Sequence, residues 1–189
     1  LFLDAVHRFE HEPALRRFTG VGDEWADLTY GEVLQRARAV AAGLASLGIV
    51  PGDRVALLSE NRPEWAIADY GCLMAGVVDV PVYPSLIASQ VGYILGNADA
   101  RLVFASTRDQ VDKALAAADE VDLDVTVVAL DPIAASSARV IQWSDLIARG
   151  QEQLGDQPMS EFEHRARAIT PDELATILYT SGTTGPPKG

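Results

Sequence analysis

The sequence has 189 residues, of which 48% are hydrophobic, and this is enough for one domain with a sizeable core. Its formal net charge is −12, from 27 acidic and 15 basic residues, and its longest run of basic residues is the pair Arg16-Arg17. Nucleic acids and anionic membrane surfaces are therefore poor partners for this chain.

From residue 29 onward, helical and strand-like patterns alternate along the chain. A capping box formed by Thr29 and Glu32 opens an amphipathic helix, and Gly48 is placed to end it. We expect helices over residues 29–47, 61–75, 89–96, 108–119 and 143–154, and strands over residues 54–58, 77–82, 102–105, 125–129 and 174–179. This order predicts βαβ units and hence an α/β fold, with a mostly parallel sheet flanked by helices.

Three details of this pattern carry expectations of their own. Asn61 is expected to cap the second helix, with Pro63 in its first turn. Pro81 cannot donate a backbone hydrogen bond, so the strand over 77–82 should lie at a sheet edge or end early. The stretch over 149–168 carries many charges and little periodicity, and we expect it to be an irregular excursion on the surface.

The cysteine and histidine residues give little sign of chemistry. Cys72 is the only cysteine, so an internal disulfide is excluded, and a reducing compartment is the simpler assumption. Because no signal peptide and no apolar run of membrane-spanning length is visible, we expect a cytoplasmic location. Cys72 lies on an apolar helical face without a nearby base, which favours a core position over a nucleophile. His7, His11 and His164 show no metal-ligand pairing and are expected on the solvated surface.

The strongest chemical signal is the run Tyr-Thr-Ser-Gly-Thr-Thr-Gly-Pro-Pro-Lys-Gly at residues 179–189. Hydroxyl donors, glycines without a Cβ atom and one cation suit close contact with the oxygens of a polyphosphate. The residues expected to bind the phosphates are Thr180, Ser181, Gly182, Thr183, Thr184, Gly185 and Lys188. The apolar, β-branched run over 174–179 is expected to be a buried strand that delivers this loop to a fixed place.

Residues 179–189 fit a Walker A loop or a flexible linker less well. A Walker A loop requires Ser or Thr after its lysine, whereas Gly189 follows Lys188 here. A flexible linker has a similar composition, but a linker has no need of the apolar run before it. Pro186 and Pro187 are expected to stiffen the end of the stretch, and we expect residues 181–185 to stay free to close on a bound polyphosphate.

The same residues resemble a known family. The run matches every fixed position of the phosphate-binding signature of the adenylate-forming enzymes, in which Tyr or Phe precedes TSGTTGxPKG. Upstream stretches resemble the N-terminal region of the long-chain fatty-acyl-CoA synthetases, at residues 53–65, 75–84, 90–95 and 100–104. Together the similar parts cover most of residues 28–130 and 170–189.

This resemblance implies a two-step ligase. A carboxylate attacks the α-phosphate of ATP to give an acyl-adenylate and pyrophosphate, and coenzyme A then attacks the mixed anhydride. ATP, Mg²⁺ and coenzyme A are implied as cofactors and co-substrates, and a long-chain fatty acid as the substrate. The loop would bind the β- and γ-phosphates, with Mg²⁺ sharing the charge that develops on the departing pyrophosphate. No catalytic residue and no metal ligand is expected within residues 1–189.

The resemblance also implies that residues 1–189 are the N-terminal part of a large AMP-binding domain, an incomplete part of the adenylate-forming enzyme fold. We therefore expect the 189-residue chain alone to catalyse neither adenylation nor thioester formation. Two alternatives to a fatty-acid ligase stay open: activation of an amino, aryl or short-chain acid, and a non-catalytic remnant. Contact with membranes to collect substrate also stays open. Residues 60–62 and 83–84 are expected to be scaffold, because turn and capping roles explain them.

Overall fold

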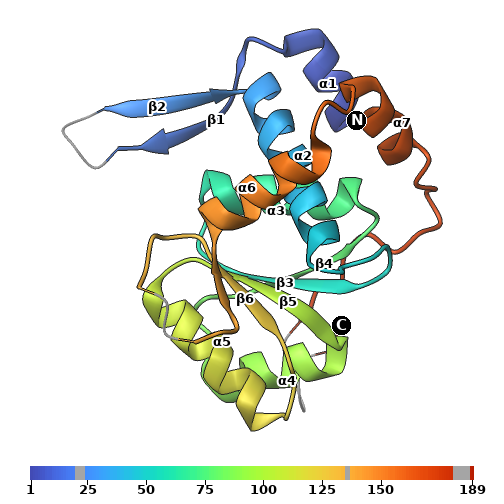
Figure 1. Cartoon of the computed structure of the whole chain (residues 1–189). Coiled ribbons are helices and arrows are strands. Elements are labelled where there is room, and N and C mark those ends of the chain that lie inside the picture. The colour runs from blue at the N-terminus through green and yellow to red at the C-terminus, as the bar shows by residue number, and fades with distance from the viewer. Residues whose placement is uncertain (20–23, 135–136, 181–187) are drawn as a thin grey trace.

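The computed structural model describes residues 1–19, 24–134, 137–180 and 188–189. Its centre is a five-stranded parallel sheet with the strand order β4-β3-β5-β6-β7. The strands are β3 (Arg54–Leu58), β4 (Val78–Val82), β5 (Ala100–Ala105), β6 (Thr126–Ala129) and β7 (Val140–Gln142). Helices link β3, β4, β5 and β6 in turn (Figure 1), so the predicted α/β fold with βαβ units is confirmed.

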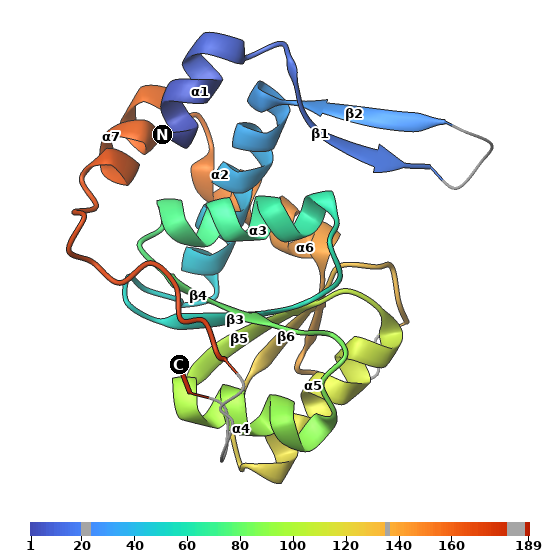
Figure 2. The same ribbon diagram turned by 180° about the vertical axis from the view of Figure 1, so that it is seen from behind.

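Helices cover both faces of this sheet (Figures 1 and 2). On one face lie α2 (Tyr30–Ser46), α3 (Pro63–Met74) and α6 (Trp143–Leu154), and on the other lie α4 (Ala88–Ala98) and α5 (Arg108–Glu120). Side chains of β3 alternate between the two cores, since Val55 and Leu57 pack toward α2 and α3 whereas Ala56 and Leu58 pack toward α4 and α5. Burial on both faces explains why these strands are continuous apolar runs in the sequence.

The α2 and α3 layer is held by close helix packing. α2 and α6 cross where a Cβ atom on Gly150 would lie 1.8 Å from the carbonyl oxygen of Ala39. Only a glycine allows the two backbones to approach this closely. Cys72 of α3 is fully buried in the same core, as predicted.

The ends of α2 follow the sequence signals, but the start of α3 does not. The backbone N–H of Glu32 donates to Thr29 Oγ1 at 3.2 Å, and that of Thr29 donates to the Glu32 carboxylate at 2.8 Å, which confirms the capping box. The prediction that Asn61 caps α3 is wrong, because Arg62 occupies the N-cap position and makes no side-chain cap. A residue before proline is driven into an extended conformation, so Pro63 places the N-cap geometry on Arg62.

Five elements are absent from the sequence-based prediction. They are α1 (Phe2–Phe9), the antiparallel hairpin of β1 (Pro13–Phe18) and β2 (Trp25–Thr29), the short strand β7, and α7 (Met159–Arg167). The hairpin projects away from the rest of the molecule (Figure 1). The expected irregular excursion over 149–168 is wrong at both ends, because residues 149–154 belong to α6 and Phe162 of α7 is buried against Leu3 and Leu34.

Two further observations concern the edge of the sheet and membranes. β4 ends the strand order, so the expectation from Pro81 of an edge strand is confirmed. Within the described ranges, none of the helices combines the length and the apolar character that crossing a membrane requires.

Candidate functional site

Only the two ends of the predicted phosphate loop lie in the described part of the chain. Ser181, Gly182, Thr183, Thr184 and Gly185 fall outside it. The backbone N–H of Thr180 donates to the Lys188 carbonyl at 2.9 Å, and the N–H of Lys188 donates to the Thr180 carbonyl at 3.1 Å. This antiparallel pair holds the two ends of the loop side by side.

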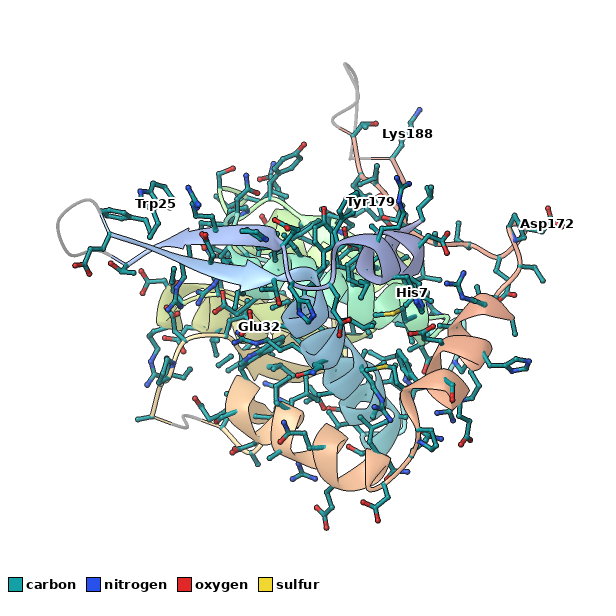
Figure 3. The ribbon with its side chains drawn as sticks, turned by 90° about the horizontal axis from the view of Figure 1, so that it is seen from above. His7, Trp25, Glu32, Asp172, Tyr179 and Lys188 are labelled. Atoms are coloured by element: carbon teal, nitrogen blue, oxygen red, sulfur yellow. The ribbon has the colours of Figure 1, made fainter. Side chains whose placement is uncertain are left out.

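Both ends of the loop are exposed to solvent. Figure 3 shows the Lys188 side chain pointing away from the body of the molecule. The ammonium group of Lys188 is therefore accessible to an anion from solution. A lysine ammonium carries three donors and no acceptor, which suits the oxygens of a phosphate group.

The segment over residues 174–180, which we call the stem, leads to this loop along the edge of β4 (Figure 2). The prediction of a buried strand over 174–179 is wrong. The stem pairs with β4 through one parallel bridge, between Asp79 and Thr176, and its residues Leu174 and Leu178 are 60% and 61% exposed. A continuing parallel ladder would next require an N–H from Pro81, which proline lacks, so regular pairing stops there.

One face of the stem is nevertheless packed. Ile177 and Tyr179 contact the core on the α4 and α5 side of the sheet. The Tyr179 hydroxyl donates to Asn97 Oδ1 of α4 at 2.6 Å, and burial raises the pKa of this tyrosine. A Cβ atom on Gly189 would lie 2.8 Å from the Tyr179 ring, so the chain returning from the loop rests on that ring. Aromatic packing thus fixes the base of the loop.

The opposite face of the stem meets the buried carboxyl group of Asp79, which lies beside the half-buried Asp69. Asp79 of β4 is 2% exposed and accepts a hydrogen bond on Oδ2 from the Thr176 hydroxyl at 3.2 Å. Burial raises the pKa of Asp79 to about 6. Burial, with the charge of Asp79, raises the pKa of Asp69 of α3 to about 7. Sequence reasoning missed this pair, although an acidic residue between valines in a buried strand was a visible signal.

The stem runs parallel to β4, so the loop leaves it toward the carboxyl ends of the strands. In open α/β sheets this edge carries ligands, at the point where the strand order reverses, which here lies between β3 and β5. Polar side chains gather at that point. Glu60, which follows β3, accepts hydrogen bonds from the Ser106 hydroxyl and from Gln110 Nε2.

Hydrogen bonds and ion pairs with neighbouring side chains hold the polar groups of this network. Burial acts to raise the pKa of Glu60, but the hydrogen bonds from Ser106 and Gln110 outweigh it, and the net pKa is lowered. Arg62 pairs with Glu64 at 2.8 Å and with Asp131 at 2.9 Å. These contacts fit the expected scaffold role of residues 60–62.

The described residues offer no ready metal site. Nowhere in those ranges do three or more His, Cys, Asp or Glu side chains gather closely enough to hold a metal ion. His7 lies 2.8 Å from Glu163, while His11 and His164 are exposed, as expected for surface histidines. The residues described here therefore do not fit a Mg²⁺ site of their own.

Comparison with known proteins places the chain in context. The model of the family described as AMP-binding enzyme matches residues 2–189. The long-chain-fatty-acid–CoA ligase FadD15 of Mycobacterium bovis is 36% identical over 170 residues, which cover 87% of this chain and 26% of that protein. The peroxisomal long chain acyl-CoA synthetase 7 of Arabidopsis thaliana is 32% identical over 198 residues, which cover all of this chain and 27% of that protein.

Solved structures share the fold. The anthranilate CoA ligase AuaEII, in complex with anthranoyl-AMP, superposes with a TM-score of 0.79 at 20% identity, over 98% of this chain and 32% of that one. A benzoate CoA ligase from Burkholderia xenovorans superposes with a TM-score of 0.72 at 25% identity, over 94% of this chain and 31% of that one. The chain spans about a quarter of the length of the curated relatives that it matches.

Proposed function

Since the chain belongs to the AMP-binding enzyme family, we propose that residues 1–189 are the N-terminal part of the large domain of an ATP-dependent acyl-CoA ligase. In this proposal the chain supplies the loop that binds the phosphates of ATP. The observation that carries it is the pairing of Thr180 with Lys188, which closes the ends of a hydroxyl- and glycine-rich segment.

In the proposed reaction the loop stabilises charge and forms no covalent bond. An oxygen of the carboxylate attacks the α-phosphorus of ATP, and the bond between that phosphorus and the oxygen leading to the β-phosphate breaks. The electron pair leaves with pyrophosphate, so negative charge grows on the β- and γ-phosphates. Donors already aimed at those oxygens stabilise the transition state more than the ground state.

Individual roles follow from residue chemistry. Lys188 is proposed to contact the phosphates through its ammonium group. Thr180, Ser181, Thr183 and Thr184 are proposed to donate hydroxyl or backbone hydrogen bonds, and Gly182 and Gly185 to let the backbone approach closely. No catalytic residue is assigned within residues 1–189.

The proposed substrate is a long-chain fatty acid, because the relatives of 36% and 32% identity carry that activity in their names. Coenzyme A is proposed as the acceptor of the acyl group. Magnesium is proposed to bind together with ATP and to share the negative charge of its phosphates. A cytoplasmic location is part of the proposal and rests on one buried cysteine, which fits a reducing compartment.

Lys188 provides the test of the proposed role of the loop. In the full-length protein, fatty-acid-dependent exchange of pyrophosphate into ATP should be measured for the wild type and for Lys188→Met. Loss of one cation on a phosphate is expected to lower kcat/KM for ATP about 30-fold. The only other lysine within residues 1–189, Lys113, donates to the Pro84 carbonyl at 2.7 Å, and Lys113→Met is the matched control.

Three results would count against the proposal. One is a wild-type protein that exchanges no pyrophosphate with any carboxylic acid, as expected of a non-catalytic remnant. Another is a Lys188→Met variant with the activity of the wild type. The third is equal losses in the two lysine variants. A panel of palmitate, octanoate, benzoate and amino acids then decides the substrate class, and higher activity with an aryl or amino acid would replace the fatty acid in the proposal.

The same assay tests the proposed domain organisation. The 189-residue chain alone is expected to show no exchange, because it spans only about a quarter of the ligases that it resembles. Exchange by the 189-residue chain would show that residues 1–189 already contain the adenylating machinery.

A further inference from the structure

The stem is attached to the main sheet at one residue of β4. The N–H of Asp79 donates to the Ala175 carbonyl at 3.1 Å, and the N–H of Ile177 donates to the Asp79 carbonyl at 3.0 Å. The third contact is the hydrogen bond from the Thr176 hydroxyl to Asp79 Oδ2. Because Pro81 has no N–H to continue the ladder, the pairing does not extend toward the loop.

Backbone hydrogen bonds alone do not fix which stem residue lies opposite Asp79. Every residue of the stem has an N–H and a carbonyl, so a shifted stem would pair equally well. A shift by one residue turns the side chains to the opposite face, and packing of Ile177 and Tyr179 opposes it. A shift by two residues keeps the same face toward each core, and packing opposes it less.

Side-chain chemistry distinguishes the observed register from a shift by two. Side chains alternate along an extended segment, so Leu174, Thr176 and Leu178 share the face that Thr176 turns to Asp79. A shift by two residues in either direction would place a leucine against the Asp79 carboxyl group. Thr176 is the one residue of the three that can donate a hydrogen bond to it.

The cost of burying Asp79 makes this contact important. Its Oδ1 atom has no hydrogen-bond partner among the described residues, and the groups that titrate beside it, Asp69 and Cys72 of α3, are acids. β3 places the apolar Val55 next to Asp79 in the sheet. A leucine from a shifted stem would remove the hydrogen bond from Thr176 and leave the carboxyl group with neither oxygen bonded by a side chain.

We propose that Asp79 is a positioning residue. It accepts a hydrogen bond from the Thr176 hydroxyl and thereby fixes the register of the stem on β4. This register sets where along β4 the stem delivers the start of the phosphate loop. This inference rests on the proposed function, because it concerns the same loop. Asp79 touches neither ATP nor the acid. It acts through Thr176, and through the two residues Tyr179 and Thr180 that follow on the same segment.

Thr176→Val in the full-length protein tests this role, because it removes the hydroxyl at nearly constant volume. We expect kcat/KM for ATP to fall about tenfold, which is the factor for one charge-assisted hydrogen bond, while KM for the carboxylic acid stays within about twofold. Thr176→Ser keeps the donor and is expected to restore the value to within about threefold of the wild type. Thr170→Val, in the stretch before the stem, is the matched control and is expected to behave as the wild type.

A second variant separates register from a simple loss of packing. Asp79→Val matches the valines around it in β4 and removes the acceptor, and we expect the same tenfold loss. The double variant with Thr176→Val is expected to lose no more than either single variant. Multiplied losses in the double variant would show that the two residues act independently, and they would overturn the proposal.

Hydrogen exchange gives a readout that does not depend on catalysis. The amide of Ile177 is expected to exchange at least fivefold faster in Thr176→Val, with the amides of β3 unchanged. If the wild type exchanges no pyrophosphate but the Ile177 amide responds, the proposed function fails and the register role stands. If the wild type is active and Thr176→Val matches it in both ATP kinetics and amide exchange, the register role fails and the proposed function stands.

Discussion

The central strands and the stem are both apolar in sequence, yet they differ in burial and in strand pairing. Val55, Leu57 and Phe104 in β3 and β5 are 0–1% exposed, with a strand on each side and helices on both faces. Leu174 and Leu178 in the stem are about 60% exposed, and one residue of β4 pairs with their segment. Burial of apolar area fixes the scaffold, whereas a few polar contacts place the segment that carries the loop.

The largest effect on stability is expected from a substitution in the scaffold, which is the central sheet with its flanking helices. Gly150→Ala would put a Cβ atom 1.8 Å from the Ala39 carbonyl oxygen, so α2 and α6 must move apart. We expect a loss of more than about 3 kcal/mol in the free energy of unfolding, as for other overpacked cores. Urea unfolding followed by the fluorescence of Trp143, the first residue of α6, measures it.

Gly96→Ala in α4 is the matched control, because a Cβ atom there comes no closer than 3.6 Å to another side chain. Helix propensity predicts unchanged or slightly higher stability, by up to about 1 kcal/mol. Equal stability of the two alanine variants would show that the close crossing of α2 and α6 does not limit the scaffold.

A smaller effect is expected at Asp69 of α3, beside the Asp79 to which the stem is attached. Below pH 3.8 the carboxyl group is protonated in both folded and unfolded chains. Between pH 3.8 and about 7 the folded chain keeps the proton and the unfolded chain loses it, so stability falls as pH rises. The difference between the folded and unfolded pKa values of Asp69 corresponds to at most about 4 kcal/mol in the free energy of unfolding. Partial solvation of the carboxyl group reduces this to about 2 kcal/mol.

Asp69→Asn removes this penalty. We expect the variant to match the wild type near pH 4 and to exceed it by about 2 kcal/mol at pH 8, as measured by urea unfolding at both values. Asp172→Asn, at an exposed position before the stem (Figure 3), is the control. A stability difference between Asp69→Asn and the wild type that is the same at both pH values would contradict the burial argument.

The smallest effect on global stability is expected in the stem. Tyr179→Phe removes the hydrogen bond to Asn97 and keeps the ring on which Gly189 rests. We expect a loss below about 1 kcal/mol in global stability, with faster exchange of the Thr180 amide, because local opening of the stem does not require the sheet to unfold. A global loss as large as that of Gly150→Ala would show that stem and scaffold unfold as one unit.

The scaffold was predictable because its signals are local or periodic. The capping box at Thr29 and the missing N–H of Pro81 have the same meaning in any fold, and the alternation of helices with apolar strands sets the sheet. Asn61 shows how a neighbour overrides such a signal, since Pro63 moved the cap to Arg62. α7 was missed because it buries Phe162 alone among its residues, which leaves no apolar stripe to detect.

The sequence suggested a chemistry for the candidate site but not how the loop is attached. The role of Lys188 and the hydroxyl residues in binding phosphate stays a prediction from residue type and motif, and the pairing of Thr180 with Lys188 was not foreseen. The apolar pattern of the stem indicates that Ile177 and Tyr179 prefer burial. It does not indicate what lies beside the other face of the stem, on which Leu178 is exposed. The contact of Thr176 with Asp79 joins residues 97 positions apart, which no local pattern reveals.

The pairing of Thr180 with Lys188 also has an entropic consequence. Bringing the ends of a chain of this length together costs about 2 kcal/mol in conformational entropy. Folding meets that cost before any ligand binds, so under the proposed function it does not reduce the affinity of the loop for the phosphates of ATP. One added residue changes the closure term by only about 0.1 kcal/mol. If the loop binds ATP as proposed, the dependence of ATP affinity on loop length reports how well the loop fits the phosphates, and not how hard the loop is to close.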